Sequence, residues 1–421
     1  MMKISIAIPT RSRAIYLQKC IRSVLIAAEA AECPVEVIVS DNASEDNTRE
    51  VVASFNSDRI IYHRLEQRVS MRQNFENALS LTTGSHVMFI GDDDGIVPNG
   101  LRLLEKLIET YQSEIFSWRI LNFKWPNDEM QIPGHLVVRP MKLSGRIRQI
   151  NPKKISARFF SGKYGSYQDG GMIYHGCISR ALIDRVRNQC QGTYFWCSCP
   201  DVFASIANVL ATQTTMLKID RPISIAGASP RSNGDSGMKA TLTGKQEDSK
   251  EYMSFISESR NDLFRSRASD ECSSITLHTL FALELACQLQ DVPFRINKKN
   301  WMARIKKEVA TFSPNMIPAC EENLNLIFDT NVRIKASGKA AAPDRTKALI
   351  GQMGEMADES AFAKHSLSRS TISGGEYMTD IVRAAQFLDD LVGNDDLKQA
   401  LNPPAAIPSI LRLRRKLRQL G

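Results

Sequence analysis

The first 124 residues alternate between short apolar runs and longer segments with helical spacing, and this alternation constrains the fold more than any other feature of the 421-residue chain. Runs typical of buried strands cover residues 4–9, 35–39, 59–63, 87–90 and 115–123. Segments whose apolar residues recur at helical spacing cover residues 14–31, 51–55, 71–81 and 101–111. Strands and helices that alternate in this way favour a mostly parallel sheet with helices on both faces. We therefore predict an α/β fold built on such a sheet.

Polar clusters follow three of these expected strands, at residues 10–13, 41–46 and 92–94. Ligands of open α/β sheets bind outside the carboxyl ends of the strands. The three clusters therefore predict one binding site at that edge of the sheet.

Three consecutive aspartates, Asp92, Asp93 and Asp94, form the third cluster. Neighbouring carboxylates repel one another, so the arrangement is costly unless a cation or a polar ligand is bound there. Hard divalent cations take oxygen ligands and commonly bridge to phosphates, which indicates a nucleotide-diphosphate site. The alternative is a solvated Asp-Gly turn, because Gly95 follows directly.

Composition indicates an ordinary globular protein, with 43% hydrophobic and 24% charged residues. No stretch approaches the roughly 20 apolar residues that a membrane-spanning helix needs, and the N-terminal apolar run reads as a strand rather than a signal peptide. Nine scattered cysteines do not suggest a disulfide framework. We expect a reduced, cytoplasmic protein.

The C-terminal segment 407–421 is strongly basic and has interleaved leucines and isoleucines, although the net charge of the chain is only +8. Its basic residues are Arg412, Arg414, Arg415, Lys416 and Arg418. A basic amphipathic helix of this kind predicts peripheral contact with anionic lipid, here the inner face of the cytoplasmic membrane. The alternatives are a helix packed on the protein and a solvated tail.

We expect three regions along the chain. Residues 1–230 form an α/β domain, with a nucleotide-binding part at 1–124 and an acceptor-side part at 125–230. Within the latter, residues 217–227 read as one strand. Residues 231–250 are rich in Gly, Ser and charge and predict a mobile loop. Long apolar-periodic stretches in residues 251–421 predict a mainly helical domain.

Three ordered segments carry a resemblance to a known family: "ISIAIPTRSRAIYLQKCIRSVL", "VEVIVSDNASEDNT" and "MRQNFENALSLTTGSHVMFIGDDDGIVPNGL". Together they resemble the GT-A glycosyltransferases of family 2, the inverting type, over roughly residues 3–230. The resemblance implies a nucleotide-binding α/β sandwich. It also implies transfer of a sugar from a nucleotide-diphosphate donor to an acceptor hydroxyl.

For the donor, the resemblance implies that Pro9, Thr10 and Arg11 lie against the nucleoside and that Asp41 hydrogen-bonds the base, typically uracil. Asp41 in an Asx turn is the alternative. Arg72 matches a family element on the helix before the acidic motif, and an exposed helix face is its alternative.

In the acidic motif, the resemblance implies ribose contact from the first acid, Asp92, and Mn²⁺ or Mg²⁺ contact from a later one, Asp93 or Asp94. Asp92 and Asp94 have the Asp-x-Asp spacing, whereas the register set by Pro98 favours Asp93 as the metal ligand. The choice stays open at this point.

Asp201, after Pro200 at an expected helix start, matches the family's catalytic base. Its alternative is an acid that only caps the helix, where the dipole favours it. His175 lies among apolar residues and is interpreted as a core histidine. Arg231, in the expected loop, is a candidate for reaching the donor phosphates, unless the loop is only a linker.

We therefore predict an inverting glycosyltransferase that uses a UDP-sugar and a glycan or lipid-linked acceptor, in bacterial surface polysaccharide synthesis. The alternative is a non-catalytic subunit with the same fold. A dehydrogenase would need G-x-G-x-x-G after the first strand, and a nucleotidyltransferase a Gly-rich loop there; "PTRSRA" is neither. A nucleic-acid partner is not expected, because the basic residues lack interleaved aromatics. The helical domain is expected to position the acceptor or to form a homo-oligomer.

Overall fold

A computed structural model describes residues 2–126, 134–138, 145–232, 254–255, 257–259, 274–335, 370–373 and 379–392. Its larger sheet has eight strands in the order β3-β2-β1-β4-β10-β6-β11-β9. Their bounds are β1 (Ile4–Thr10), β2 (Val35–Asp41), β3 (Ile60–Arg64), β4 (His86–Phe89), β6 (Ile115–Trp118), β9 (Ile147–Ile150), β10 (Gly176–Ser179) and β11 (Met216–Ile219). The first four of the sheet order are parallel, whereas β10 runs antiparallel to both of its neighbours. The predicted α/β class is confirmed.

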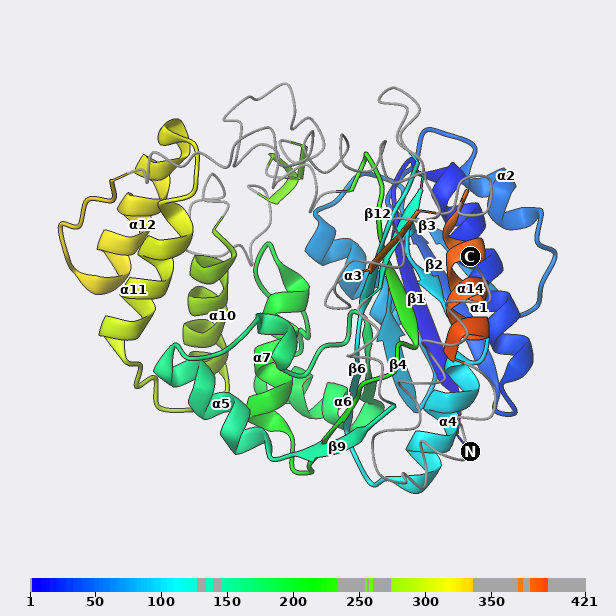
Figure 1. The fold of residues 1–421 in the computed structure, drawn as a ribbon, viewed down its shortest axis with the longest axis horizontal. Helices are drawn as coiled ribbons and strands as arrows, with labels where there is room; N and C mark the ends of the chain where they lie inside the picture. Colours follow the sequence, from blue (N-terminus) through cyan, green and yellow to red (C-terminus); the bar gives the residue numbers. More distant parts are fainter. Residues whose placement is uncertain are drawn as a thin grey trace, which may run out of the picture.

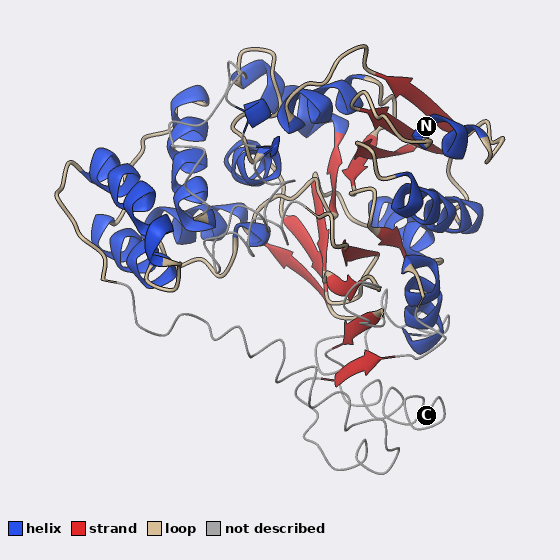
Figure 2. Cartoon of the chain, turned by 90° about the horizontal axis from the view of Figure 1, so that it is seen from above, coloured by secondary structure: helices blue, strands red, loops and turns tan. Residues whose placement is uncertain are grey.

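Helices cover both faces of this sheet, and Figure 2 shows them on either side of the strands. On one face lie α1 (Ala14–Ala30), α2 (Thr48–Ala53) and α4 (Gly100–Thr110), which pack on Ile4, Ile6 and Ile8 of β1. On the other lie α3 (Met71–Ser80), α6 (Arg180–Gln189) and α7 (Pro200–Ala211), which share a core with Ala7 and Phe89. Burial on both faces explains the near-continuous apolar character of β1.

A second sheet has five strands in the order β13-β8-β7-β12-β5. Their bounds are β5 (Gly95–Ile96), β7 (Leu121–Lys124), β8 (His135–Val138), β12 (Ser224–Ala228) and β13 (Ser370–Ser373). The predictions of one strand at 115–123 and one at 217–227 were wrong, because each segment divides between the two sheets. In the second segment the ladder stops before Pro222, which has no N–H to donate. In both segments the chain passes from the larger sheet into the second one. There β12 pairs with β5, which places β12 directly beside the acidic motif.

The helices α10 (Ile275–Leu289), α11 (Lys298–Val309) and α12 (Ile317–Phe328) share one core with the large sheet rather than forming a core of their own. Helix α10 packs on α7, α11 contacts α5 (Pro152–Ser161), and α12 packs on α10 and α11 (Figure 1). Trp301 of α11 is fully buried, and its Nε1 donates to the carbonyl oxygen of Phe159 in α5 at 2.9 Å. One hydrophobic core therefore continues from the large sheet into these helices.

Helix α14 (Ile381–Val392) lies along α1, far in space from α10–α12 (Figure 1). Ile381, Ala384 and Leu388 are buried against the second sheet. Asn99 Nδ2 also donates to Asp389 at 2.7 Å. We expected this helix in the region 251–421, yet its contacts are with the N-terminal part. The basic segment 407–421 lies outside the described residues.

Within the described ranges, none of the helices combines the length and the apolar composition needed to span a bilayer.

Candidate active site

A cavity of about 1190 Å³ opens at the carboxyl ends of β1 and β4. One wall consists of the exit of β1 and the acidic motif, and the other of the start of α7 together with α10 and α11. The predicted residues that line it are Pro9, Thr10, Arg11, Asp92, Asp93, Asp94, Asp201 and Arg231. The structure thus brings together residues as far apart in the chain as Pro9 and Arg231.

Asp92 is held by the end of β1. Its Oδ2 accepts a hydrogen bond from Thr10 Oγ1 at 2.7 Å, and its Oδ1 pairs with Arg13 at 3.1 Å. Burial works against the charged guanidinium, but the nearby Asp92 and Asp93 carboxylates outweigh it and raise the pKa of Arg13 above its ordinary value. This wall therefore presents a fixed cation next to the acidic motif.

Asp93 is held by the segment that follows β12. Its Oδ2 accepts from the Ser229 hydroxyl at 2.7 Å and from the Ser229 amide at 3.2 Å. Trp125 Nε1 donates to the backbone oxygen of Asp93 at 2.8 Å. Among the residues that the structure describes, Asp93 Oδ1 makes no hydrogen bond, so one carboxylate oxygen stays available at the cavity.

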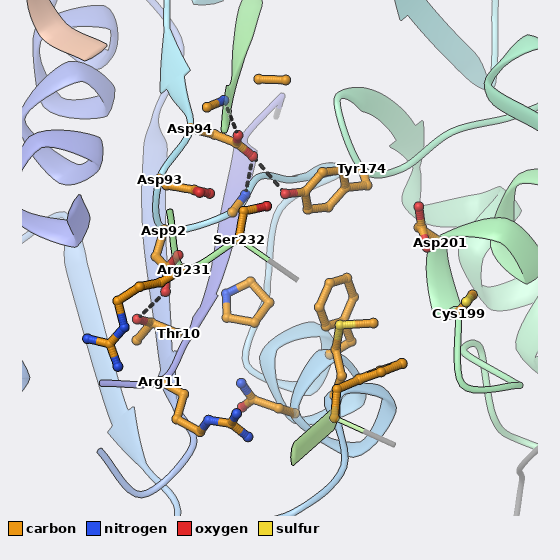
Figure 3. A pocket seen from close by; sticks show the side chains of 18 of the residues that line it. Thr10, Arg11, Asp92, Asp93, Asp94, Tyr174, Cys199, Asp201, Arg231 and Ser232 are labelled. Carbon is orange, nitrogen blue, oxygen red and sulfur yellow. Dashed lines mark hydrogen bonds between the residues drawn. The ribbon is translucent and has the colours of Figure 1, made fainter. Parts of the chain in front are cut away.

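Asp94 uses both of its oxygens within the protein. Oδ1 accepts from the Gly227 amide at 2.7 Å, and Oδ2 accepts from the Tyr174 hydroxyl at 2.8 Å and from the Gly91 amide. His175 Nε2 lies 3.1 Å from the same Oδ2, although its N–H is not aligned for a hydrogen bond in this conformation. Figure 3 shows Asp94 turned toward Tyr174.

Different neighbours shift the pKa values of the last two aspartates in opposite directions. Burial, followed by the negative charge of Asp94, raises the pKa of Asp93 to about 7. Burial also disfavours the charged form of Asp94, but His175 and the hydrogen bonds to Asp94 outweigh it and lower the pKa of Asp94. An added cation beside Asp93 would favour its ionised form.

The carboxylate of Glu258, which is distant from the acidic motif in the sequence, also lines the cavity. Glu258 pairs with Arg11 and lies 3.1 Å from Arg68 Nε. Arg231 and Ser232 also line the cavity, and the backbone oxygen of Arg231 accepts a hydrogen bond from Arg13. Several guanidinium groups therefore gather on the wall that carries the acidic motif.

Asp201 lies across the cavity from the three aspartates (Figure 3). It sits in the first turn of α7, where Pro200 occupies the start. Part of its side chain reaches the cavity, while protein atoms surround the rest. Burial raises the pKa of Asp201, and hydrogen bonds from Tyr167 and from the backbone amides at the helix start oppose that rise. Asp201 thus lies in the first turn of α7 and lines the cavity.

Comparison with known proteins identifies the N-terminal part. The family described as Glycosyl transferase family 2 matches residues 5–171. The N-terminal part of the chain therefore contains a glycosyltransferase family 2 domain. An abequosyltransferase, RfbV, of Salmonella typhimurium is 30% identical over 118 residues, which are 27% of this chain and 35% of the relative. A GalNAc(5)-diNAcBac-PP-undecaprenol beta-1,3-glucosyltransferase of Campylobacter jejuni is 34% identical over 116 residues, 26% of this chain and 36% of the relative.

The chain thus spans about a third of the length of the curated relatives it matches. Among solved structures, residues 1–349 of TarS from S. aureus align with 15% identity and a TM-score of 0.41, over 77% of this chain and 83% of that one. The mannosyltransferase PcManGT from Pyrobaculum calidifontis, solved with GDP-Man and Mn²⁺, aligns with 13% identity and a TM-score of 0.39, over 83% and 80%.

Two of the residues assigned from the glycosyltransferase resemblance do not line the cavity. Asp41 is buried; it accepts from the Ser44 amide at 2.8 Å and from the Tyr62 hydroxyl at 2.6 Å, so the turn alternative describes it. Its neighbour Asn42 lines the cavity instead.

Arg72 is also buried and donates to the carbonyl oxygen of Phe195 at 3.3 Å. Met71, Asn74 and Phe75 of the same helix line the cavity. Arg72 points elsewhere because successive helical residues are rotated by about 100°. Neither the nucleotide role nor the exposed-face alternative describes Arg72.

Sequence reasoning about this glycosyltransferase domain missed four residues that contact the acidic motif: Arg13, Tyr174, His175 and Ser229. Arg13 belongs to a polar cluster that marks a strand end, so that signal was available. Tyr174 and His175 stand in an apolar run, and Ser229 reaches Asp93 only through the second sheet. No local pattern could have found these three.

Proposed function

We propose that this protein transfers a sugar from a nucleotide-diphosphate donor to an acceptor hydroxyl with inversion at the anomeric carbon. The observation that carries the proposal is a single cavity with an acidic motif on one wall and Asp201 on the other. An inverting displacement needs the leaving group and the base on opposite sides of the reacting carbon. The two walls supply that arrangement.

The donor lies on the wall formed by β1 and the acidic motif. Arg11, Arg13 and Arg231 lie there, and guanidinium groups bind phosphate oxygens through paired, charge-assisted hydrogen bonds. Pro9 and Thr10 flank the nucleoside, and Asp92 accepts from a ribose hydroxyl. Uridine is the nucleoside we propose, as the family resemblance implies.

The residues of this wall fit a divalent cation, Mn²⁺ or Mg²⁺, held by Asp93 together with oxygens of the donor. Asp93 keeps one carboxylate oxygen available, whereas both oxygens of Asp94 are engaged by protein donors. No cluster of three His, Cys, Asp or Glu ligands occurs within the described ranges, so the protein supplies only part of the coordination. When bound, the cation would neutralise charge on the diphosphate leaving group. This assigns the metal to Asp93 and a structural role to Asp94.

Asp201 is the base. Its carboxylate takes the proton of the acceptor hydroxyl as the hydroxyl oxygen forms a bond to the anomeric carbon and the bond from that carbon to the diphosphate breaks. The Tyr167 hydroxyl and the amides at the start of α7 favour the ionised carboxylate.

The acceptor occupies the half of the cavity next to Asp201. Ile275 and His278 of α10, with Thr311 and Phe312 after α11, line this half. Apolar side chains beside hydroxyl and imidazole groups suit a sugar ring, which has apolar C–H faces and polar edges. Both curated relatives are sugar transferases, and the name of one includes an undecaprenol-linked glycan. We propose a glycan or lipid-linked acceptor of bacterial surface polysaccharide synthesis.

Calorimetric titration with UDP, GDP, CDP and dTDP, each with and without Mn²⁺, tests the donor site. Metal-dependent binding of one nucleotide is expected. Asp201→Asn should then bind that nucleotide with unchanged affinity but lose about 10²–10⁴-fold in transfer rate. No nucleotide binding, or full activity of Asp201→Asn, would contradict the proposal. Binding without any turnover of the wild type would favour a non-catalytic subunit.

A further inference from the structure

His175 occupies a place that its apolar sequence surroundings did not suggest. It has a positive φ of 52°, and only 3% of its surface is exposed. The His175 amide donates to the Phe89 carbonyl oxygen, and the Phe89 amide donates to the Ile173 carbonyl oxygen, each at 2.9 Å. This short bridge fixes His175 beside the end of β4, directly before the acidic motif.

A buried chain of polar contacts leads from Trp118 in β6 through Ser224 in β12 and His175 to Asp94. Trp118 Nε1 donates to Ser224 Oγ at 2.8 Å, and Ser224 Oγ lies 2.8 Å from His175 Nδ1. Since the serine oxygen already accepts from Trp118, its own proton is free to go to Nδ1. The other ring nitrogen, Nε2, then carries the proton that faces Asp94 Oδ2 at 3.1 Å.

Asp94 in turn closes the tight turn that begins at Gly91. Its Oδ2 accepts from the Gly91 amide, and its own amide donates to the Gly91 carbonyl oxygen at 3.2 Å. Gly227 holds the opposite carboxylate oxygen at 2.7 Å. With Asp94 held at both oxygens, the turn presents Asp92 and Asp93 to the cavity.

We infer that His175 is a positioning residue: through Asp94 it fixes the turn that directs Asp92 and Asp93 toward the donor diphosphate and its cation. The identity of the ligand rests on the proposed function. The fixing of the turn stands on the geometry alone.

Two substitutions separate this role from a purely conformational one. A glutamine amide nitrogen can reach the place of Nε2, so His175→Gln keeps a donor to Asp94. An asparagine amide is too short to do so, but asparagine tolerates a positive φ better than glutamine. If His175 positions Asp94, His175→Gln should bind UDP more tightly than His175→Asn. If only the backbone conformation of residue 175 matters, His175→Asn should bind UDP more tightly than His175→Gln.

The first readout is calorimetric titration of the full chain with UDP in the presence of Mn²⁺. His175→Gln should bind within about threefold of the wild type, and His175→Asn at least about tenfold more weakly, as expected for the loss of one close polar contact to a carboxylate. His86→Asn is the matched control, because His86 lies at the far end of β4 and its Nδ1 contacts Ser85. It should leave the affinity unchanged.

The second readout needs no ligand. Amide hydrogen exchange at Gly91 and Gly227 should accelerate in His175→Asn but not in His175→Gln or His86→Asn, since both amides donate to Asp94. Equal exchange in the two His175 variants would overturn the inference, as would His175→Asn binding UDP like the wild type. If the wild type binds no nucleotide, the proposed function fails, and the exchange experiment still decides the role of His175.

Discussion

Removal of the Tyr167 hydroxyl should move the acid limb of sugar transfer to higher pH. This hydroxyl donates to the carboxylate of Asp201 and so favours the ionised form. The reciprocal effect is visible in Tyr167, where the negative charge of Asp201, followed by burial, raises the pKa of the phenol well above its ordinary value. Tyr167→Phe leaves the carboxylate buried without this donor, and the pKa of Asp201 rises further.

The size of the shift follows from the strength of one hydrogen bond. A hydrogen bond to a charged group contributes about 1.5–3 kcal/mol, and about 1.4 kcal/mol corresponds to one pKa unit. Because part of the Asp201 side chain reaches the cavity, water replaces some of the lost interaction, and the lower end of this range applies. We expect the acid limb of Tyr167→Phe about one pH unit above that of the wild type. Below its pKa the base is protonated, so the rate there falls about tenfold for each further pH unit.

The assay is the initial rate of transfer between about pH 5 and pH 9 at saturating donor, analysed as kcat/KM for the acceptor, which reports the enzyme form that binds the acceptor. Tyr62→Phe is a matched control, since Tyr62 also donates to an aspartate, Asp41, but lies outside the cavity. Its acid limb should coincide with that of the wild type. An unmoved limb in Tyr167→Phe, or a shift to lower pH, would refute Asp201 as the base.

Three other perturbations test the structure. Trp301→Ala should destabilise the protein by about 3–5 kcal/mol, and urea unfolding followed by circular dichroism should keep a single transition, because α11 shares its core with α5 and α7. Burial raises the pKa of Glu36, but hydrogen bonds from Lys3, Ser5 and Thr83 outweigh it and lower the pKa to about 2. The stability that Glu36 contributes is therefore present above about pH 4.5 and is lost as the pH falls toward about 2, and Glu36→Gln should flatten this part of a pH series of urea midpoints. Deletion of residues 407–421 should reduce cosedimentation with anionic vesicles but not with neutral ones, and unchanged cosedimentation would exclude lipid contact by this segment.

The sequence predicted the features that depend on near neighbours. Strand and helix periodicities reach only two to four residues along the chain, so the order of elements through α4, apart from the two-residue strand β5, could be predicted, with ends within a few residues. Polar residues that directly follow strands pointed to the edge of the sheet where the cavity lies, because the end of a strand can also be recognised from near neighbours. For Asp41 the sequence could not choose between two roles, because a turn residue and a ligand-binding residue have the same local pattern; its bonds to Ser44 and Tyr62 come from the fold.

The tertiary structure alone decided how the acidic motif is held and what lies opposite it. Gly227 and Ser229 reach Asp94 and Asp93 from positions 133 and 136 residues away. Gly227 lies in β12 and Ser229 directly after it, and β12 belongs to the second sheet whereas β11, before Pro222, belongs to the larger one. Likewise α14 packs on α1, and α10 and α11 close the cavity near Asp201. Such contacts depend on the path of the whole chain and on which apolar faces bury one another, and no local periodicity contains that information. The sequence by itself determined that three carboxylates stand at a strand end; the fold determined that both oxygens of Asp94 are engaged by the protein and that Asp93 Oδ1 has no hydrogen bond among the described residues.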